Sequence, residues 1–156
     1  MALNTEEQGW SHEIMPATKD NIRDIVGLNG QFHLDIKGFK WDKPEWIKEE
    51  IEKGNYFVLK QGDKVIGAID TQKLGSGDLY IEAIAVEPSQ HGTGLGKRLI
   101  MFAKDMGQNL GCKKLTVESF QSYGLLDFYQ KVGFKLDTPS IGYYEGKPFY
   151  RFVMHL

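Results

Sequence analysis

An apolar strand, a run of alternating glycines and an amphipathic helix follow one another between residues 79 and 110. The strand, Leu79–Val86, carries apolar residues on both of its faces. Such a strand is typical of the centre of a sheet that is covered on both sides. The glycines are Gly92, Gly94 and Gly96, and a helix begins inside their run and continues to about residue 110. This order constrains the chain to an α/β fold in which the glycines join a buried strand to a helix.

The other elements are predicted from periodicity and from turn residues. Helices are expected at residues 18–29, 42–54, 94–110 and 123–132, and strands at 12–17, 55–60, 64–71, 79–86, 114–117, 134–136 and 149–154. We expect Asp42 to cap the second of these helices, because Pro44 and Glu45 follow it. The pattern predicts one domain, residues 1–156, with an α/β sandwich around a mixed sheet.

Composition limits the classes of partner. The formal net charge is −2 and the isoelectric point is near 6.1, so neither nucleic acid nor a membrane surface is expected as a partner. A single cysteine, Cys112, excludes an intrachain disulfide, and residues 1–10 resemble neither a signal nor a transit peptide. We therefore expect a cytoplasmic protein. The four histidines show no metal-ligand spacing, so no metal is expected; they are His12, His33, His91 and His155.

The glycine run predicts a site for a pyrophosphate. Backbone N–H groups at a helix start have no acceptor inside the helix, and the helix dipole is positive there. Glycines allow a bulky anion to approach this backbone closely. A nucleotide P-loop would need glycine and Ser or Thr where the chain has His91 and Arg98, and a dinucleotide fingerprint would need glycine at Lys97. Both alternatives are therefore disfavoured, while a simple tight turn before a core helix stays open.

Two motifs resemble the GNAT superfamily, the GCN5-related N-acetyltransferases. Gly94 and Gly96 match the two glycines of its Gln/Arg-x-x-Gly-x-Gly/Ala motif, and His91 stands at the Gln/Arg position, which is a departure. The later segment Phe128–Phe134, FYQKVGF, resembles the family's Phe-Tyr-x-Lys-x-Gly-Phe signature. Both motifs occur in the family's order and spacing, and the likeness extends over nearly the whole chain.

The resemblance implies a GNAT fold and a cosubstrate, acetyl-coenzyme A. The fold would have a mostly antiparallel sheet of about seven strands, splayed between the fourth and fifth, and about four flanking helices. Backbone groups of the strand end would bind the pantetheine arm and the loop would cradle the pyrophosphate. The cofactor-binding residues implied are Ile84, Ala85, Val86, His91, Gly92, Thr93, Gly94, Leu95, Gly96, Lys97, Ser122 and Tyr129. The other partner would be an amine acceptor, and a homodimer is also compatible with the resemblance.

Glu82 and Tyr129 are the candidate catalytic residues. Glu82 is the one charged residue of its strand, and several family members carry a glutamate there as general base. An ammonium acceptor needs such a base, because its lone pair attacks only after a proton has left. Tyr129 corresponds to the tyrosine that lies near the coenzyme sulfur in family members, where a phenol can protonate the leaving thiolate. Each also has a plainer interpretation, a structural carboxylate and a packed aromatic ring respectively.

Other hypotheses remain beside that of an N-acetyltransferase acting by direct transfer in a ternary complex. Ser122 stands where the family often has asparagine, and it is equally suited to cap the helix that follows. Cys112 has no nearby histidine in the sequence and is interpreted as a buried filler rather than a nucleophile. The chain as a whole is alternatively a sensor that binds acyl-coenzyme A without turnover, or a structural interaction domain.

Overall fold

A computed structural model of the chain describes residues 13–137 and 142–156. The chain forms two compact units. Unit 1 contains the described residues up to Leu34, Gly38–Asp70 and Ala83–Leu99, and unit 2 contains Asp35–Lys37, Thr71–Glu82 and Ile100–Leu156. The expectations for residues 1–10 and for His12 concern a part of the chain outside the described residues.

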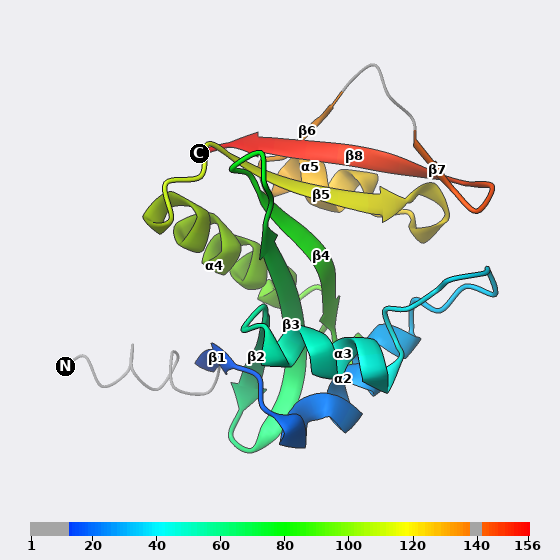
Figure 1. Cartoon of the computed structure of the whole chain (residues 1–156), viewed down its shortest axis with the longest axis vertical. Coiled ribbons are helices and arrows are strands. Elements are labelled where there is room, and N and C mark those ends of the chain that lie inside the picture. Colours follow the sequence, from blue (N-terminus) through cyan, green and yellow to red (C-terminus); the bar gives the residue numbers. More distant parts are fainter. Residues whose placement is uncertain (1–12, 138–141) are drawn as a thin grey trace. The chain divides into compact units, whose positions relative to one another are not determined.

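The elements follow the predicted order (Figure 1). The helices are η1 (Lys19–Asn21), α2 (Ile22–Gly30), α3 (Pro44–Glu52), η2 (Pro88–Gln90), α4 (Leu95–Asn109), η3 (Gln121–Tyr123) and α5 (Leu126–Lys131). The strands are β1 (Glu13–Pro16), β2 (Tyr56–Gln61), β3 (Lys64–Lys73), β4 (Leu79–Val86), β5 (Lys114–Phe120), β6 (Lys135–Leu136), β7 (Gly142–Tyr144) and β8 (Lys147–His155).

The strands form one sheet in the order β1-β2-β3-β4-β5-β8-β6, with β7 paired to β8. The position of β4 in the middle confirms the prediction from its apolar faces. β4 and β5 pair in parallel, and their register joins Leu79–Ile81 to Leu115–Val117, although β4 continues to Val86. This short ladder agrees with the splayed strands that the family resemblance implies, so the α/β fold class is confirmed.

Unit 1 packs two helices against antiparallel strands. β2 pairs with β1 and with β3, and the hairpin turn between β2 and β3 is formed by Gly62 and Asp63 of the predicted residues 61–63, because Gln61 still pairs with Lys64. α2 and α3 lie side by side over these strands in Figure 1. Their apolar faces bury one cluster, which removes this surface from water; it consists of Ala17, Ile25, Leu28, Ile47, Tyr56, Val58, Val65, Ala68 and Ala85.

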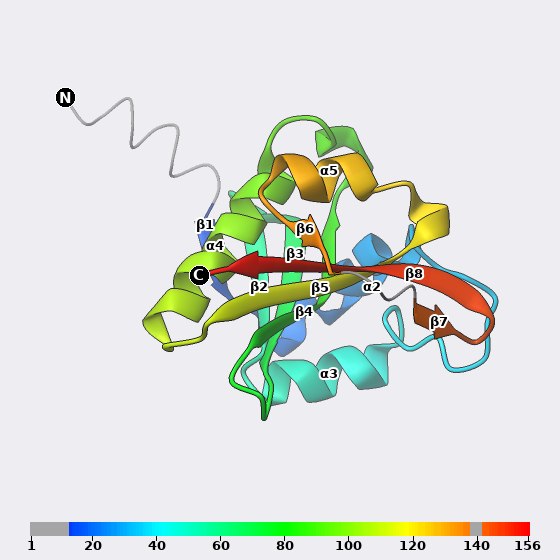
Figure 2. The same cartoon turned by 90° about the horizontal axis from the view of Figure 1, so that it is seen from above.

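Unit 2 is built on the antiparallel pair β5–β8, whose register runs from Lys114↔His155 to Phe120↔Phe149. α5 lies beside β8 in Figure 2, and this contact is made by stacked aromatic rings. Side chains alternate across the strands, so Val117 and Phe152 face the buried side while Glu118 and Arg151 face the other. Charged groups of β5 and β8 are therefore gathered on one face of the sheet.

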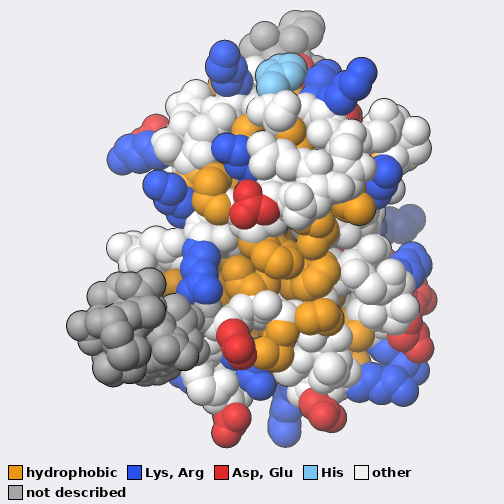
Figure 3. Space-filling view, turned by 90° about the vertical axis from the view of Figure 1, so that its left-hand side faces the viewer, with side chains coloured by type: hydrophobic (Ala, Val, Ile, Leu, Met, Phe, Trp, Pro, Cys, Tyr) orange, Lys and Arg blue, Asp and Glu red, His pale blue; other side chains and the backbone are white. Residues whose placement is uncertain are grey.

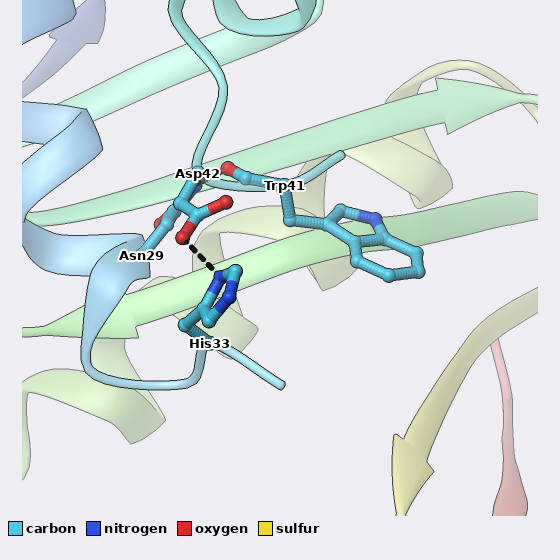
Figure 4. Close-up of polar contacts among 4 residues, drawn as sticks. All are labelled: Asn29, His33, Trp41 and Asp42. Atoms are coloured by element: carbon cyan, nitrogen blue, oxygen red, sulfur yellow. Dashed lines mark hydrogen bonds and ion pairs between the residues drawn. The ribbon is translucent and has the colours of Figure 1, made fainter. Parts of the chain in front are cut away.

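Several predicted helix boundaries are wrong, and local geometry explains them. Asp42 does not cap α3: the N-cap is Lys43, and the Asp42 Oδ2 atom lies 2.7 Å from Nδ1 of His33 instead (Figure 4). The last helix begins at Leu126 rather than Tyr123, because Gly124 adopts a left-handed φ of 68° and ends a preceding 3-10 turn. Leu110, predicted on the buried stripe of α4, lies beyond the helix end and is exposed.

The helices and the surface add two observations. Among the helices of residues 13–137 and 142–156, none is long and apolar enough to span a membrane.

On the face drawn in Figure 3, Lys and Arg side chains are interspersed with Asp and Glu. That mixture is what a net charge of −2 from 19 basic and 21 acidic residues leads one to expect.

Candidate active site

The glycine loop presents unpaired amide groups at the start of α4. Gly92 and Gly94 have φ angles of 82° and 88°, a left-handed conformation that glycine adopts without strain. The first hydrogen bond of the helix runs from Arg98 N to Gly94 O over 3.0 Å. The N–H groups of Leu95, Gly96 and Lys97 precede it and therefore have no acceptor within the helix.

This geometry fits the diphosphate of a coenzyme. A Cβ atom built on Gly92 or Gly94 meets no atom within 4 Å, so the space beside both glycines is open. Residues 91–94 are exposed, whereas Leu95 is buried and anchors the helix start. Exposed amides with the positive end of the 15-residue helix α4 behind them suit an anion with several oxygens.

Side-chain hydrogen bonds hold the loop against the end of β4. His91 donates from Nε2 to the carbonyl oxygen of Val86 over 2.9 Å. Gln31, which follows α2, donates to the same oxygen over 3.0 Å and to Leu28 O over 2.8 Å. The histidine that departs from the family motif therefore has a structural role, because it closes the loop onto the strand that precedes it.

Glu82 belongs to a polar cluster on one face of unit 2. The Tyr80 hydroxyl donates to Oε1 of Glu118 over 3.0 Å, and Glu82 lies two residues along β4 on the same face. Arg151 donates from Nε to Oε2 of Glu118 over 2.9 Å. Burial, followed by the charges of Glu82 and Glu118, raises the pKa of the Tyr80 hydroxyl above its ordinary value of 10.0. Tyr80 therefore stays protonated at neutral pH.

Sequence reasoning found only part of this cluster. Strand alternation places Tyr80 on the face of Glu82, so its proximity was predictable. The predicted strand ended at Val117, short of Glu118, so Glu118 was missed. A sequence signal for the longer strand does exist. Apolar Leu115 and Val117, which are buried, alternate with polar Thr116 and Glu118, which are less buried, and this alternation extends β5 to Glu118.

Tyr129 lies in an aromatic cluster of unit 2. Its ring stacks on Phe152 with centroids 4.8 Å apart, and Phe128 and Phe134 contact it edge-on. The residue is only 3% exposed, and burial raises the pKa of its hydroxyl above the ordinary value of 10.0. Tyr129 is therefore a packed aromatic residue, and its phenol stays protonated at neutral pH.

The remaining predicted residues are placed as follows. Ser122 is exposed within η3 and does not cap α5, whose N-cap is Leu125, so the predicted capping role is wrong. Thr93 donates its hydroxyl to Gln90 O over 2.5 Å, which tightens the turn before the glycines. Cys112 is free and buried, as expected of a filler.

Comparison with known proteins identifies the family. The chain matches the acetyltransferase (GNAT) family over residues 28–134. This protein belongs to that family. Glucosamine 6-phosphate N-acetyltransferase of Trypanosoma brucei brucei is 41% identical to this GNAT protein over 56 residues, which are 36% of this chain and 37% of the relative. The alignment thus spans little more than a third of that relative's length.

Solved structures extend the likeness of this GNAT protein to the whole fold. An IAA acetyltransferase from Bacillus cereus ATCC 14579 superposes with a TM-score of 0.71 and 25% identity, covering 94% of this chain and 100% of the other. A PaiA N-acetyltransferase from Thermoplasma acidophilum, solved in complex with coenzyme A, superposes with a TM-score of 0.75 and 15% identity, covering 94% and 99%. At 15% identity, the match to the Thermoplasma protein shows a shared fold alone.

Proposed function

We propose that this GNAT protein transfers the acetyl group of acetyl-coenzyme A to a primary amine by direct attack in a ternary complex. The observation that carries the proposal is the start of α4, where the amides of Leu95, Gly96 and Lys97 have no helical acceptor. Membership of the GNAT family supports the same cosubstrate. Bound acetyl-coenzyme A supplies an activated thioester, and the protein's residues supply binding, orientation and proton transfer.

Cofactor binding falls to backbone groups of unit 1. The amides of Gly92 and of residues 94–97 bind the pyrophosphate, with the helix dipole adding favourable charge, while the Thr93 amide donates to Gln90 O. Ile84, Ala85 and Val86 end β4 and offer main-chain groups to the pantetheine arm. Because His91 and Gln31 both bind Val86 O, the loop is held against this strand end by contacts within the protein itself. Such preorganisation lowers the entropic cost of binding.

Glu82 and Tyr129 carry the proton transfers. Glu82 accepts the proton of the acceptor ammonium, which frees the lone pair for attack on the thioester carbon. Tyr129 donates its phenol proton to the departing coenzyme thiolate. Burial raises the pKa of this hydroxyl, which keeps the phenol protonated at neutral pH and makes it a weaker acid than a free phenol. Cys112 is buried, which favours direct transfer over an acyl-enzyme.

Calorimetry with coenzyme A tests the glycine loop with a matched pair of variants. Gly94→Ala and Gly111→Ala both place a Cβ at a left-handed φ, 88° and 74°, and neither Cβ meets another atom within 4 Å. Both variants should therefore lose a similar stability of about 1–2 kcal/mol. We expect only Gly94→Ala to weaken coenzyme A binding, by about tenfold or more. Equal affinities for both variants would contradict the proposed site.

A thiol-release assay with acetyl-coenzyme A tests turnover. The acceptors are amino acids, polyamines, aminoglycosides, glucosamine 6-phosphate and peptides with a free N-terminus. Release of free thiol with at least one amine class supports the transferase. Coenzyme binding without release from any of these amines would instead identify a non-catalytic acyl-coenzyme A sensor, the alternative that the family fold also permits.

A further inference from the structure

Two carboxylates interact with one hydroxyl on one face of unit 2. Tyr80 Oη lies 3.0 Å from Glu118 Oε1, and Glu82, two residues along β4 on the same face, interacts with the same hydroxyl. A phenol has one proton to donate, so it can satisfy only one of two ionised carboxylates at a time. While the hydroxyl donates to Glu118, its oxygen can still accept a hydrogen bond from a protonated neighbouring carboxyl group.

Such a contact is what a proton-transfer path requires. We propose that Tyr80 and Glu118 relay to solvent the proton that Glu82 takes from the acceptor amine. This proposal rests on the proposed function, since it extends the work of the same general base. Tyr80 and Glu118 act through Glu82 and are positioning and relay residues rather than groups that touch the acceptor.

The relay balances without another reactant. The ammonium proton moves to a carboxylate oxygen of Glu82, and the amine keeps the electron pair that attacks the thioester carbon. Protonated Glu82 then passes its proton to Tyr80 Oη while the phenol proton of Tyr80 passes to Glu118 Oε1. Glu82 returns to a carboxylate, Tyr80 is again a neutral phenol, and Glu118 gives the proton to bulk water.

The environment of Tyr80 and Glu118 supports each step. Burial and two neighbouring carboxylates raise the pKa of Tyr80, so a free phenolate is costly and the two protons must move together. Glu118 has 35% of its side chain exposed, which gives its proton access to water. Arg151 holds Oε2 of Glu118 at 2.9 Å, so that Oε1 remains directed at Tyr80.

Tyr80→Phe and Glu118→Gln test the relay without removing the base. Each variant is assayed for thiol release at fixed pH with increasing imidazole, a small diffusible proton carrier. We expect wild-type kcat to be independent of imidazole. In both variants kcat should fall by about tenfold or more and rise again with imidazole concentration. Coenzyme A affinity, measured by calorimetry, should be unchanged.

Matched controls separate the relay from a general effect of substitution. Tyr143→Phe alters a tyrosine that is 69% exposed, and Glu45→Gln alters an exposed glutamate on α3; both should keep wild-type kcat and show no response to imidazole. Wild-type kcat in Tyr80→Phe or Glu118→Gln would overturn the relay, and so would a reduced kcat that imidazole does not raise. Absence of thiol release from the wild-type protein would instead contradict the proposed function itself.

Discussion

The ring of Tyr129 lies 4.8 Å from the ring of Phe152, at an interplanar angle of 29°. This offset stack joins α5 to β8 within unit 2, and Phe134 packs against both rings. Stacked aromatic pairs add to the stability that burial provides. The residue proposed as the catalytic acid is therefore also part of the hydrophobic core, and substitutions can separate the two roles.

Tyr129→Phe removes the hydroxyl and keeps the stack. We expect the free energy of unfolding to change by less than about 1 kcal/mol, because the ring contacts are retained. If the phenol protonates the thiolate, kcat for thiol release should fall by about 100-fold. Urea denaturation and steady-state kinetics measure the two effects. Tyr129→Ala is the companion variant and should lose about 3 kcal/mol or more of stability. Unchanged kcat in Tyr129→Phe would leave Tyr129 with a packing role alone.

Alkaline pH should destabilise the protein through Tyr129. Burial raises the pKa of this hydroxyl in the folded state, so above about pH 10 the unfolded chain loses a proton that the folded chain keeps. Unfolding then releases a proton, and stability falls as pH rises, by about 1.4 kcal/mol per pH unit for this group. The stability it contributes is fully present below about pH 10. In urea titrations, Tyr129→Phe should show a correspondingly shallower loss, and parallel curves for the two proteins would contradict the assignment.

Glu82→Gln tests the general base while keeping the size of the side chain. We expect kcat to fall by about 100-fold or more, because the amide cannot accept the ammonium proton. Affinity for coenzyme A should stay the same, since the proposed cofactor contacts are backbone groups of residues 84–86, 92 and 94–97. Thiol-release kinetics and calorimetry provide the two readouts. A variant that kept full kcat would return Glu82 to a structural role beside Tyr80.

The sequence predicted the elements better than their ends. Periodicity located β4 and α4, because a strand apolar on both faces and an apolar stripe on a helix have few alternative interpretations. The prediction of a helix end failed where a contact in the fold competes with a capping pattern in the sequence. Asp42 has the sequence pattern of a helix cap, yet its carboxylate binds His33, nine residues earlier, a pairing that depends on the path of the intervening loop.

In the candidate site, too, some features were predictable from the sequence and others were not. The glycine loop was predictable because its amides follow from the chain order of strand, glycines and helix. Contacts across the sheet were not: Glu118 reaches Tyr80 from another strand, and that meeting depends on the register of β5 with its neighbours. Register is fixed by tertiary packing, and a single sequence carries little information about it.

A buried carboxylate at the end of α3 gives the last prediction. Glu50 is 2% exposed, and its oxygens accept from Asn55 Nδ2 over 3.0 Å and from Lys53 Nζ over 3.3 Å. Asn55→Ala removes a donor from a charged group that water cannot reach, which should cost about 1.5–3 kcal/mol of stability. Lys53 is 63% exposed, so Lys53→Met should cost less than about 1 kcal/mol. Urea denaturation of both variants measures the difference, and a larger loss for Lys53→Met than for Asn55→Ala would show that the amide is not the main support of this carboxylate.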